Sequence, residues 1–363
     1  MEYEQERGRL ALAGRRLLEA GLVARTWGNL SVRVGQTQFL ITPSGMDYER
    51  LRPEDMALVS LEDLKSEGPH RPSSEKAMHA EIYRLRPEAG FLIHTHQTAA
   101  SCLGLSGQAL AAPGSAILGP RVPCARYALP STKALARNVR EAAASEPRCP
   151  AVLLRSHGAL LMGPDEEAAF AAAAELERVC AARLPQPGPD GTADFGSSER
   201  LGTRFRLVRD GVETIHEVAD ERLQYPASLH AEIYRAYPVR CLLAERGGAA
   251  VRASRSGALV RPYLDDLAQI AGADLRSVEP DRAVRALRGR AAVYLTGMGA
   301  LCAGESRDEA EAVREILRKD ALARLCAERT PGCRPVPPAD AAVQRLFYVK
   351  KYAARRNAEG AGC

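Results

Sequence analysis

Several features that would place this chain in a specialised class of proteins are absent from its 363 residues. There is no run of about 18 apolar residues, which is the length that a membrane-spanning helix needs, so we expect no membrane partner. The opening stretch, Met1-Glu-Tyr-Glu-Gln-Glu-Arg7, is charged and lacks the apolar region of a secretory signal peptide. We therefore expect a cytoplasmic protein.

Disulfide chemistry and nucleic-acid binding are also poorly supported. The nine cysteines are scattered, and none stands in a Cys-X-X-Cys spacing, so most are expected to be small buried apolar residues. Aromatic residues make up 5% of the chain and are not interleaved with basic clusters, so we expect no nucleic-acid partner. The net charge of +5 is mild and fits either phosphorylated substrates or an ordinary solvated surface.

What the sequence does contain is typical of a globular protein with two domains. Apolar residues account for 46% of the chain and charged residues for 26%. A Pro- and Gly-rich stretch, Pro185-Gln-Pro-Gly-Pro-Asp-Gly191, has the composition of a linker. We therefore expect a first domain over residues 1–184, a linker over residues 185–198 and a second domain over residues 199–363.

A helix is predicted to begin at Ser73 and Ser74. Glu75 would lie in its first turn, and His79 follows four residues later, so both side chains would project from one helical face. The free N–H groups at the start of such a helix favour an anion. The simpler interpretation is that Ser73 only caps the helix.

Three histidines follow two apolar runs. Phe91–Ile93 is predicted to be a buried strand, so His94 and His96 would point to the same side of it. His157 ends a second apolar run much later in the chain. A lone histidine is usually a core or surface residue, but three imidazoles with the Glu75 carboxylate make a ligand set suited to zinc or a similar divalent ion.

Two loops near the start could bind a phosphate monoester. Gly28-Asn29 and Thr42-Pro-Ser-Gly45 combine glycines, which allow close backbone approach, with neutral hydrogen-bond donors. Ser73 and Ser74 would add further donors. Taken alone, Thr42-Pro-Ser-Gly45 is equally well explained as a turn. The loops contain no lysine, so they do not form a P-loop.

The second half repeats part of the first without its chemistry. His79-Ala-Glu-Ile-Tyr-Arg84 recurs as His230-Ala-Glu-Ile-Tyr-Arg235. The positions of Glu75, His94, His96 and His157 are then taken by Pro226, Ala244, Arg246 and Met298. We interpret this half as a truncated, metal-free copy that lacks the early loops. Because His230 persists where the ligands are lost, we predict that His79 makes a helix–sheet hydrogen bond and is not a ligand.

These motifs occur in the order and spacing of a known family. Gly28-Asn29, Thr42–Gly45, Ser73-Ser-Glu75, His94-Thr-His96 and His157-Gly158 resemble the class II aldolase/adducin family, of the L-fuculose-1-phosphate aldolase type, over about half of the chain. The resemblance implies an α/β fold, a three-layer α/β/α domain with a mostly antiparallel sheet. The predicted strand hairpin near the start agrees with that fold.

The resemblance also implies a function. Family enzymes are zinc-dependent aldehyde-lyases that cleave a phosphorylated ketose by a retro-aldol step through a metal-stabilised enediolate. The residue matching Glu75 moves protons at the enediolate carbon. The implied metal ligands are Glu75, His94, His96 and His157. The implied phosphate-binding residues are Gly28, Asn29, Thr42, Ser44, Gly45, Ser73 and Ser74.

Some alternatives remain open at this point. Family aldolases often use a tyrosine of a neighbouring subunit as proton donor, but the matching loop, Ala111–Ser115, contains none. Tyr127, Tyr348 or Tyr352 could replace it. A sugar-phosphate dehydratase or epimerase of the same superfamily, or an adducin-like scaffold without catalysis, are the rival functions. Family enzymes assemble as rings, so we expect a homo-oligomer or a pseudo-oligomer formed within one chain.

Overall fold

The structure is a computed structural model that describes residues 2–23 and 27–360, with side chains described up to Lys350. The chain divides into two compact units. The first comprises Met1–Leu184 with Thr330–Cys333, and the second comprises Pro185–Arg329 with Arg334–Cys363. Within the described residues, we find no helix with the length and apolar character that a membrane span requires.

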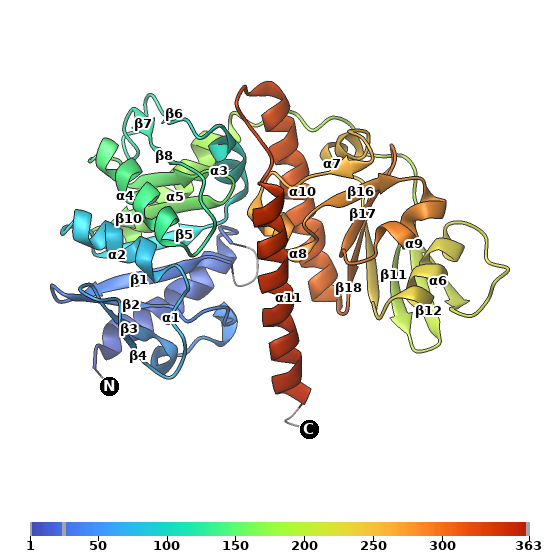
Figure 1. The fold of residues 1–363 in the computed structure, drawn as a ribbon, viewed down its shortest axis with the longest axis horizontal. Helices are drawn as coiled ribbons and strands as arrows, with labels where there is room; N and C mark the ends of the chain where they lie inside the picture. Colours follow the sequence, from blue (N-terminus) through green and yellow to red (C-terminus); the bar gives the residue numbers. More distant parts are fainter. Residues whose placement is uncertain (1, 24–26, 361–363) are drawn as a thin grey trace. The chain divides into compact units, whose positions relative to one another are not determined.

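An eight-stranded sheet forms the centre of the first unit, in the order β4-β3-β2-β1-β5-β10-β9-β8 (Figure 1). Neighbouring strands are antiparallel except β8 and β9, which are parallel. The strands are β1 (Asn29–Val34), β2 (Gln38–Ile41), β3 (Ala57–Ser60), β4 (Ser66–Glu67), β5 (Phe91–Thr95), β8 (Cys124–Ala125), β9 (Ala151–Leu154) and β10 (Gly158–Gly163). A separate pair joins β6 (Leu110–Ala111) to β7 (Arg121–Val122).

Helices cover both faces of this sheet. They are α1 (Glu4–Glu19), α2 (Lys76–Leu85), α3 (Thr98–Leu103), α4 (Lys133–Ser145) and α5 (Glu166–Ala181). One apolar cluster joins α1, α3 and α5 to the sheet through residues such as Leu10, Ala100, Leu176 and Ile93. A second cluster joins α2 and α4 to the opposite face through residues such as Ile82, Val139 and Leu92. The expected three-layer α/β/α arrangement with a mostly antiparallel sheet is therefore confirmed.

Local sequence signals explain where several elements begin. Thr132 Oγ1 accepts a hydrogen bond from the Leu135 N–H at 3.2 Å, and Asp165 Oδ1 accepts one from the Ala168 N–H at 2.8 Å. These side chains satisfy backbone donors that the first turns of α4 and α5 leave unpaired. At the start of β5, a Cβ on Gly90 would lie 2.1 Å from a backbone oxygen of Pro164, so only glycine fits there.

The second unit is built on a matching sheet, in the order β13-β12-β11-β14-β18-β17-β16-β15. Its strands are β11 (Ser197–Leu201), β12 (Arg204–Arg209), β13 (Val212–Glu217), β14 (Cys241–Glu245), β15 (Leu259–Val260), β16 (Leu275–Val278), β17 (Ala292–Leu295) and β18 (Gly299–Gly304). Its helices are α6 (Ala227–Ala236), α7 (Gly248–Ala253), α8 (Asp265–Ile270), α9 (Ala283–Ala286), α10 (Arg307–Arg329) and α11 (Pro338–Gly360).

Strand register identifies which positions of the two units correspond. His94 pairs with Leu160 in the first unit, and Ala244 pairs with Leu301 in the second. Ser31 pairs with Leu92 between β1 and β5, and Ser198 pairs with Leu242 between β11 and β14. Strands β11, β12 and β13 therefore occupy the places of β1, β2 and β3.

Two sequence expectations need adjustment. The stretch 185–198, expected to be a linker, lies in the second unit, and its last two residues already belong to β11. The second unit also keeps the three-strand meander, which the sequence interpretation did not foresee. The loop between β2 and β3 does lack a counterpart, because only Asp210 and Gly211 separate β12 from β13.

Candidate metal centre

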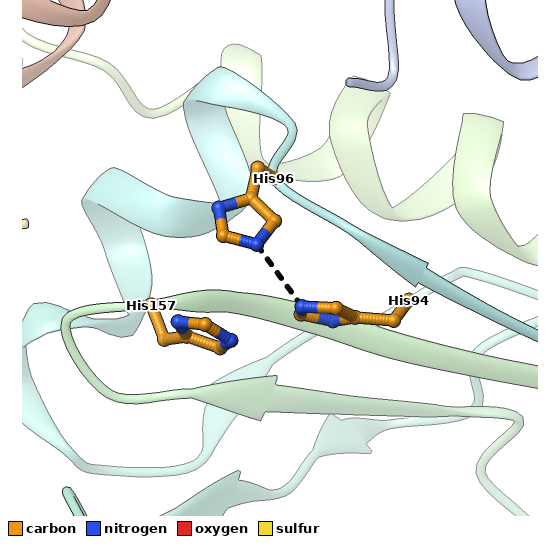
Figure 2. Close-up of side chains that lie close together, drawn as sticks. All are labelled: His94, His96 and His157. Atoms are coloured by element: carbon orange, nitrogen blue, oxygen red, sulfur yellow. Dashed lines mark hydrogen bonds between the residues drawn. The ribbon is translucent and has the colours of Figure 1, made fainter. Parts of the chain in front are cut away.

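The three predicted histidines meet at one end of two neighbouring strands (Figure 2). His94 lies on β5, His96 follows directly after it, and His157 lies in the turn between β9 and β10. Because β5 pairs with β10, residues distant in sequence come together. All three side chains are buried, and their ligand nitrogens lie within 4.8 Å of one another. In the described part of the chain, no other group of three or more His, Cys, Asp or Glu side chains comes this close.

The hydrogen bonds of His94 fix which of its nitrogens faces the cluster. Its Nδ1 lies 2.9 Å from the carbonyl oxygen of Ala159, so Nδ1 carries the proton and Nε2 carries the lone pair. That Nε2 lies 3.0 Å from Nε2 of His96 (Figure 2). Two imidazole lone pairs at this distance repel each other unless a proton or a cation lies between them. The arrangement therefore fits either the hydrogen bond drawn in Figure 2, with a proton on His96, or a cation bound between the two rings.

Glu75, which immediately precedes α2, completes the cluster. Its Oε1 lies 3.1 Å from His157 Nε2, and its Oε2 lies 3.2 Å from His94 Nε2. Burial raises the pKa of this carboxyl, but the adjacent His94 and His157 outweigh burial and hold the pKa well below its usual range. Burial also lowers the pKa of His94. A divalent ion requires an ionised carboxylate and neutral imidazoles of its ligands, so at this point it would take the place of the protons on the imidazoles.

Helix α2 begins later than the sequence predicted. Glu75 precedes the helix, which starts at Lys76, so Glu75 is not in the first turn. The chain turns here because Ser73 Oγ accepts a hydrogen bond from the Glu75 N–H at 3.2 Å. The Lys76 and Met78 N–H groups donate to the carbonyl oxygens of Ser73 and Glu75. Fewer free N–H groups therefore face an anion here than a helix beginning at Ser73 would offer.

The predicted phosphate-binding loops lie side by side. The Ser44 N–H donates to the Arg71 carbonyl at 2.9 Å, and the Ser73 N–H donates to the Thr42 carbonyl at 3.0 Å. These bonds join residues 42–45 to residues 71–74, which lead directly to Glu75. The structure thus brings Ser44 close to Ser73 in space, as the phosphate-binding interpretation requires.

The members of this predicted set differ in exposure. Ser44, Gly45 and Gly28 are partly exposed, and Ser74 is exposed, whereas Asn29, Thr42 and Ser73 are buried. Thr42 Oγ1 already accepts a hydrogen bond from the Leu30 N–H at 3.2 Å. Asn29 Nδ2 donates to Glu75 Oε2 at 2.9 Å. Thr42 and Asn29 therefore contact the surrounding protein, while the exposed members are accessible to a ligand.

Tyr48 is a site residue that sequence reasoning missed. Its hydroxyl donates to the Gly28 carbonyl at 2.8 Å, and its side chain is buried. A Cβ on Gly28 would lie 2.7 Å from the His94 carbonyl oxygen, so Gly28 lies close to the His94 backbone as well as to Tyr48. Burial raises the pKa of Tyr48, which keeps its hydroxyl protonated. No periodicity or motif marks Tyr48, because its role depends only on tertiary contact.

The prediction that His79 has a structural role is confirmed. Its Nδ1 lies 2.7 Å from Ser31 Oγ, which links α2 to β1. His230 makes the same contact with Ser198 Oγ at 2.7 Å in the second unit. A contact kept where the metal ligands are replaced belongs to the fold.

The candidate proton-donating tyrosines are placed as follows. Tyr127 is half-buried in the first unit, two residues after β8. Tyr348 lies on α11 of the second unit, with the Arg345 guanidinium 5.9 Å from its ring centre. The side chain of Tyr352 lies outside the described residues. Which tyrosine, if any, donates the proton stays a prediction.

Comparison with known proteins identifies the family of the first half of the chain. The family described as class II aldolase and adducin N-terminal domain matches residues 8–184. The 5-deoxy-D-ribulose 1-phosphate aldolase of Bacillus thuringiensis serovar kurstaki is 34% identical over 180 residues, which cover 49% of this chain and 83% of that protein.

Solved structures similar to the chain include two named L-fuculose 1-phosphate aldolase. One is 32% identical with a TM-score of 0.46, and the match covers 50% of this chain and 86% of that one. The other, from Thermus thermophilus, is 34% identical with a TM-score of 0.42, and the match covers 48% of this chain and 89% of that one. These sequence matches show that the chain belongs to the class II aldolase and adducin N-terminal domain family through residues 8–184.

Proposed function

We propose that the first unit is a zinc-dependent aldehyde-lyase that cleaves a phosphorylated ketose by a retro-aldol step. The observation that carries this proposal is the convergence of His94, His96, His157 and Glu75 beside two loops with exposed hydrogen-bond donors. Three imidazole nitrogens and a carboxylate fit Zn²⁺ better than a hard cation such as Mg²⁺. A bound Zn²⁺ would supply Lewis acidity toward a substrate oxygen.

Each side chain then has a defined task. The three histidines would hold the ion, and the bond from His94 Nδ1 to the Ala159 carbonyl keeps that ring oriented. Ser44, Gly45, Ser73 and Ser74, with Gly28, would bind the phosphate and so orient the reacting bond. Binding energy from that remote group can be used at the reacting carbon.

The chemistry assigns proton transfer to Glu75. Cleavage breaks a carbon–carbon bond, releases an aldehyde and leaves the electron pair on the carbon next to the ketose carbonyl. The hydroxyl on the departing carbon gives up one proton as it becomes the aldehyde carbonyl, and the carbon that keeps the electron pair gains one, so the cleavage is balanced overall. Glu75, once it holds a proton, would deliver it to that carbon, and in the reverse direction would remove it. A carboxylate that lies against two imidazoles while ionised can serve as this base once the substrate enters. The name of the Bacillus thuringiensis relative suggests ketose 1-phosphates as the first substrates to test.

A cleavage screen of ketose 1-phosphates tests the proposal. Wild-type protein should release an aldehyde and dihydroxyacetone phosphate, and chelator should abolish the release. Glu75→Gln should lower turnover by roughly 10²–10⁴-fold, the usual contribution of a general base, while bound metal is retained. Loss of water from the substrate without cleavage would instead identify a dehydratase. Purified protein without stoichiometric metal or turnover would favour a scaffold.

A further inference from the structure

We propose that Arg71 is a further substrate-binding residue, and that its guanidinium binds the substrate phosphate together with Ser44. The inference rests on the proposed function, because it adds a residue to the same site. The residues that the family resemblance assigns to the phosphate are all uncharged, and Glu75, which follows Ser74 directly, is an acid. A phosphate monoester carries about −1.5 to −2 charge at pH 7, so those residues alone give it no counter-charge.

Backbone pairing places Arg71 beside the exposed part of the phosphate-binding loops. An antiparallel bridge joins Pro43 to Pro72. Next to this bridge, the Ser44 N–H donates to the Arg71 carbonyl at 2.9 Å, so Ser44 lies opposite Arg71. Directly opposite residues of an antiparallel pair project from the same face, with Cβ atoms about 4.5–5.5 Å apart. A phosphate bound by the Ser44 hydroxyl therefore lies within reach of the Arg71 side chain.

The backbone on both sides of Arg71 is held in place, whereas its side chain is available. Before it, His70 Nε2 lies 3.0 Å from Asp55 Oδ1, and after it, the Ser73 N–H donates to the Thr42 carbonyl at 3.0 Å. The Arg71 side chain is exposed and makes no hydrogen bond or ion pair with any residue that the structure describes. A fixed backbone with an unengaged guanidinium is what a ligand-binding arginine requires.

Lys76 is the other cation beside the Ser73–Glu75 segment, and it is already engaged. Its Nζ donates to the Leu64 carbonyl at 2.6 Å, in the turn between β3 and β4. Arginine also suits a phosphate better than lysine, because its planar guanidinium donates two parallel hydrogen bonds to two oxygens. Arg71 is therefore the better candidate for the charge that the loops lack.

The second unit shows what the equivalent arginine does in a different setting. The alignment of the two repeated helix segments places Arg222 at the position of Arg71. Arg222 Nε donates to Asp220 Oδ1 at 3.2 Å, so this guanidinium pairs with an acid of its own segment. Pro69 stands at the position of Asp220 in the first unit. The arginine thus lacks a carboxylate partner in the unit that has the phosphate-binding loops, as expected if a phosphate is its partner.

The test compares Arg71→Ala with Arg222→Ala, which removes the same charge from the equivalent position of the second unit. Arg71→Ala should weaken the binding of inorganic phosphate to metal-loaded protein by roughly tenfold, because a charge-assisted hydrogen bond is lost. Calorimetry measures this affinity. With a cleaved ketose phosphate, KM should rise by a similar factor while kcat stays within about twofold of wild type. Arg222→Ala should change neither quantity.

Two further measurements separate phosphate recognition from general damage. Arg71→Lys keeps the charge but loses the paired donors, so it should recover only part of the phosphate affinity. Added NaCl should narrow the difference between wild type and Arg71→Ala, because salt screens an exposed charge. Bound metal and the unfolding temperature should match wild type in all three variants, since Arg71 and Arg222 are both exposed.

Three results would overturn the inference. They are an unchanged phosphate affinity in Arg71→Ala, an equal loss of affinity in Arg222→Ala, and a wild-type protein that binds no phosphate. Failure of every ketose phosphate to react, with phosphate affinity lowered in Arg71→Ala alone, would count against the proposed function and leave the role of Arg71 supported.

Discussion

The two units place different side chains at equivalent points of the same strand pairing. His94 on β5 faces Leu160 on β10, whereas Ala244 on β14 faces Leu301 on β18. The turn before β10 carries His157, and the turn before β18 carries Met298. Both turns end in a glycine whose Cβ would lie 2.1–2.2 Å from a backbone oxygen of the neighbouring strand. The backbone that positions the ligands has therefore been kept where the ligands have not.

A second difference lies on the sheet face that α1 covers in the first unit. There, Val32 and Leu40 form a buried cross-strand pair. The equivalent pair in the second unit is Glu199 and Arg206, joined by an ion pair of 2.9 Å. No counterpart of α1 precedes β11 among the described residues. A face without a covering helix carries charge, because exposed apolar strands would promote aggregation.

The largest expected difference between the two units is the effect of a substitution on bound metal and turnover. His96→Ala should reduce bound Zn²⁺ from about one ion per chain to nearly none and lower kcat/KM by at least about a thousandfold. Arg246→Ala, at the equivalent position of the second unit, should change neither quantity. Arg246 lies 3.5 Å from Asp194 and 3.9 Å from Asp210, so its loss removes two ion pairs. Metal analysis with turnover measurements checks both variants, and metal loss in Arg246→Ala would contradict the comparison.

The contact between a serine hydroxyl and a buried histidine should contribute equally to the stability of both units. Ser31 Oγ contacts His79 and Tyr83, and Ser198 Oγ contacts His230 and Tyr234, each at 2.7–2.8 Å. Removing either hydroxyl leaves two buried polar groups without a partner. Each loss should cost its own unit about 1–3 kcal/mol of unfolding free energy.

Calorimetric unfolding of Ser31→Ala and Ser198→Ala measures these two losses. Chelator identifies the transition of the first unit, because it should move only that one. Bound metal should remain at the wild-type level in both variants. A large effect in only one unit would mean that the two contacts are not equivalent.

The sequence could predict the histidine cluster because its signals are local. His94 lies on a short apolar strand and His96 directly after it, with the spacing that sends both rings to one side, and His157 lies in the turn after a second strand. The three-layer fold followed from the family resemblance, and the strand hairpin agreed with it. The contact between Asn29 and Glu75 was not predictable, because it depends on where α2 begins, which Ser73 decides through a side-chain hydrogen bond.

Strands β11–β13 escaped prediction for a physical reason. A half-buried strand is recognised by alternating apolar and polar residues. Without a covering helix, β13 (Val212–Glu217) is exposed along almost its whole length and has no such alternation. Its partner β12 keeps only Phe205 and Leu207 in the core. In β13 the pattern that prediction relies on was lost together with the helix, whereas in β12 Phe205 and Leu207 still alternate with Arg204 and Arg206.

The smallest expected difference concerns the turn before the third ligand position. Ser156 adopts a left-handed conformation with φ of 60°, and Gly297 holds the same place in the second unit with φ of 74°. This conformation costs a non-glycine residue about 1–2 kcal/mol. A Cβ on Gly297 would meet nothing closer than Arg255 Nε at 3.7 Å, so Gly297→Ser adds backbone strain without a clash.

Gly297→Ser adds about 1–2 kcal/mol of backbone strain but removes about 0.5–1 kcal/mol of conformational freedom from the unfolded chain, so it should destabilise the second unit by about 0.5–1 kcal/mol. Ser156→Gly removes strain from the first unit, but the glycine also gives the unfolded chain about 0.5–1 kcal/mol of extra conformational freedom. The strain is the larger of the two effects, so Ser156→Gly should stabilise the first unit by about 0.5–1 kcal/mol, and bound metal should stay unchanged. Calorimetry on both variants, with chelator to identify each transition, measures the difference. Equal destabilisation of both units would show that strain at Ser156 is offset by contacts that Gly297 lacks.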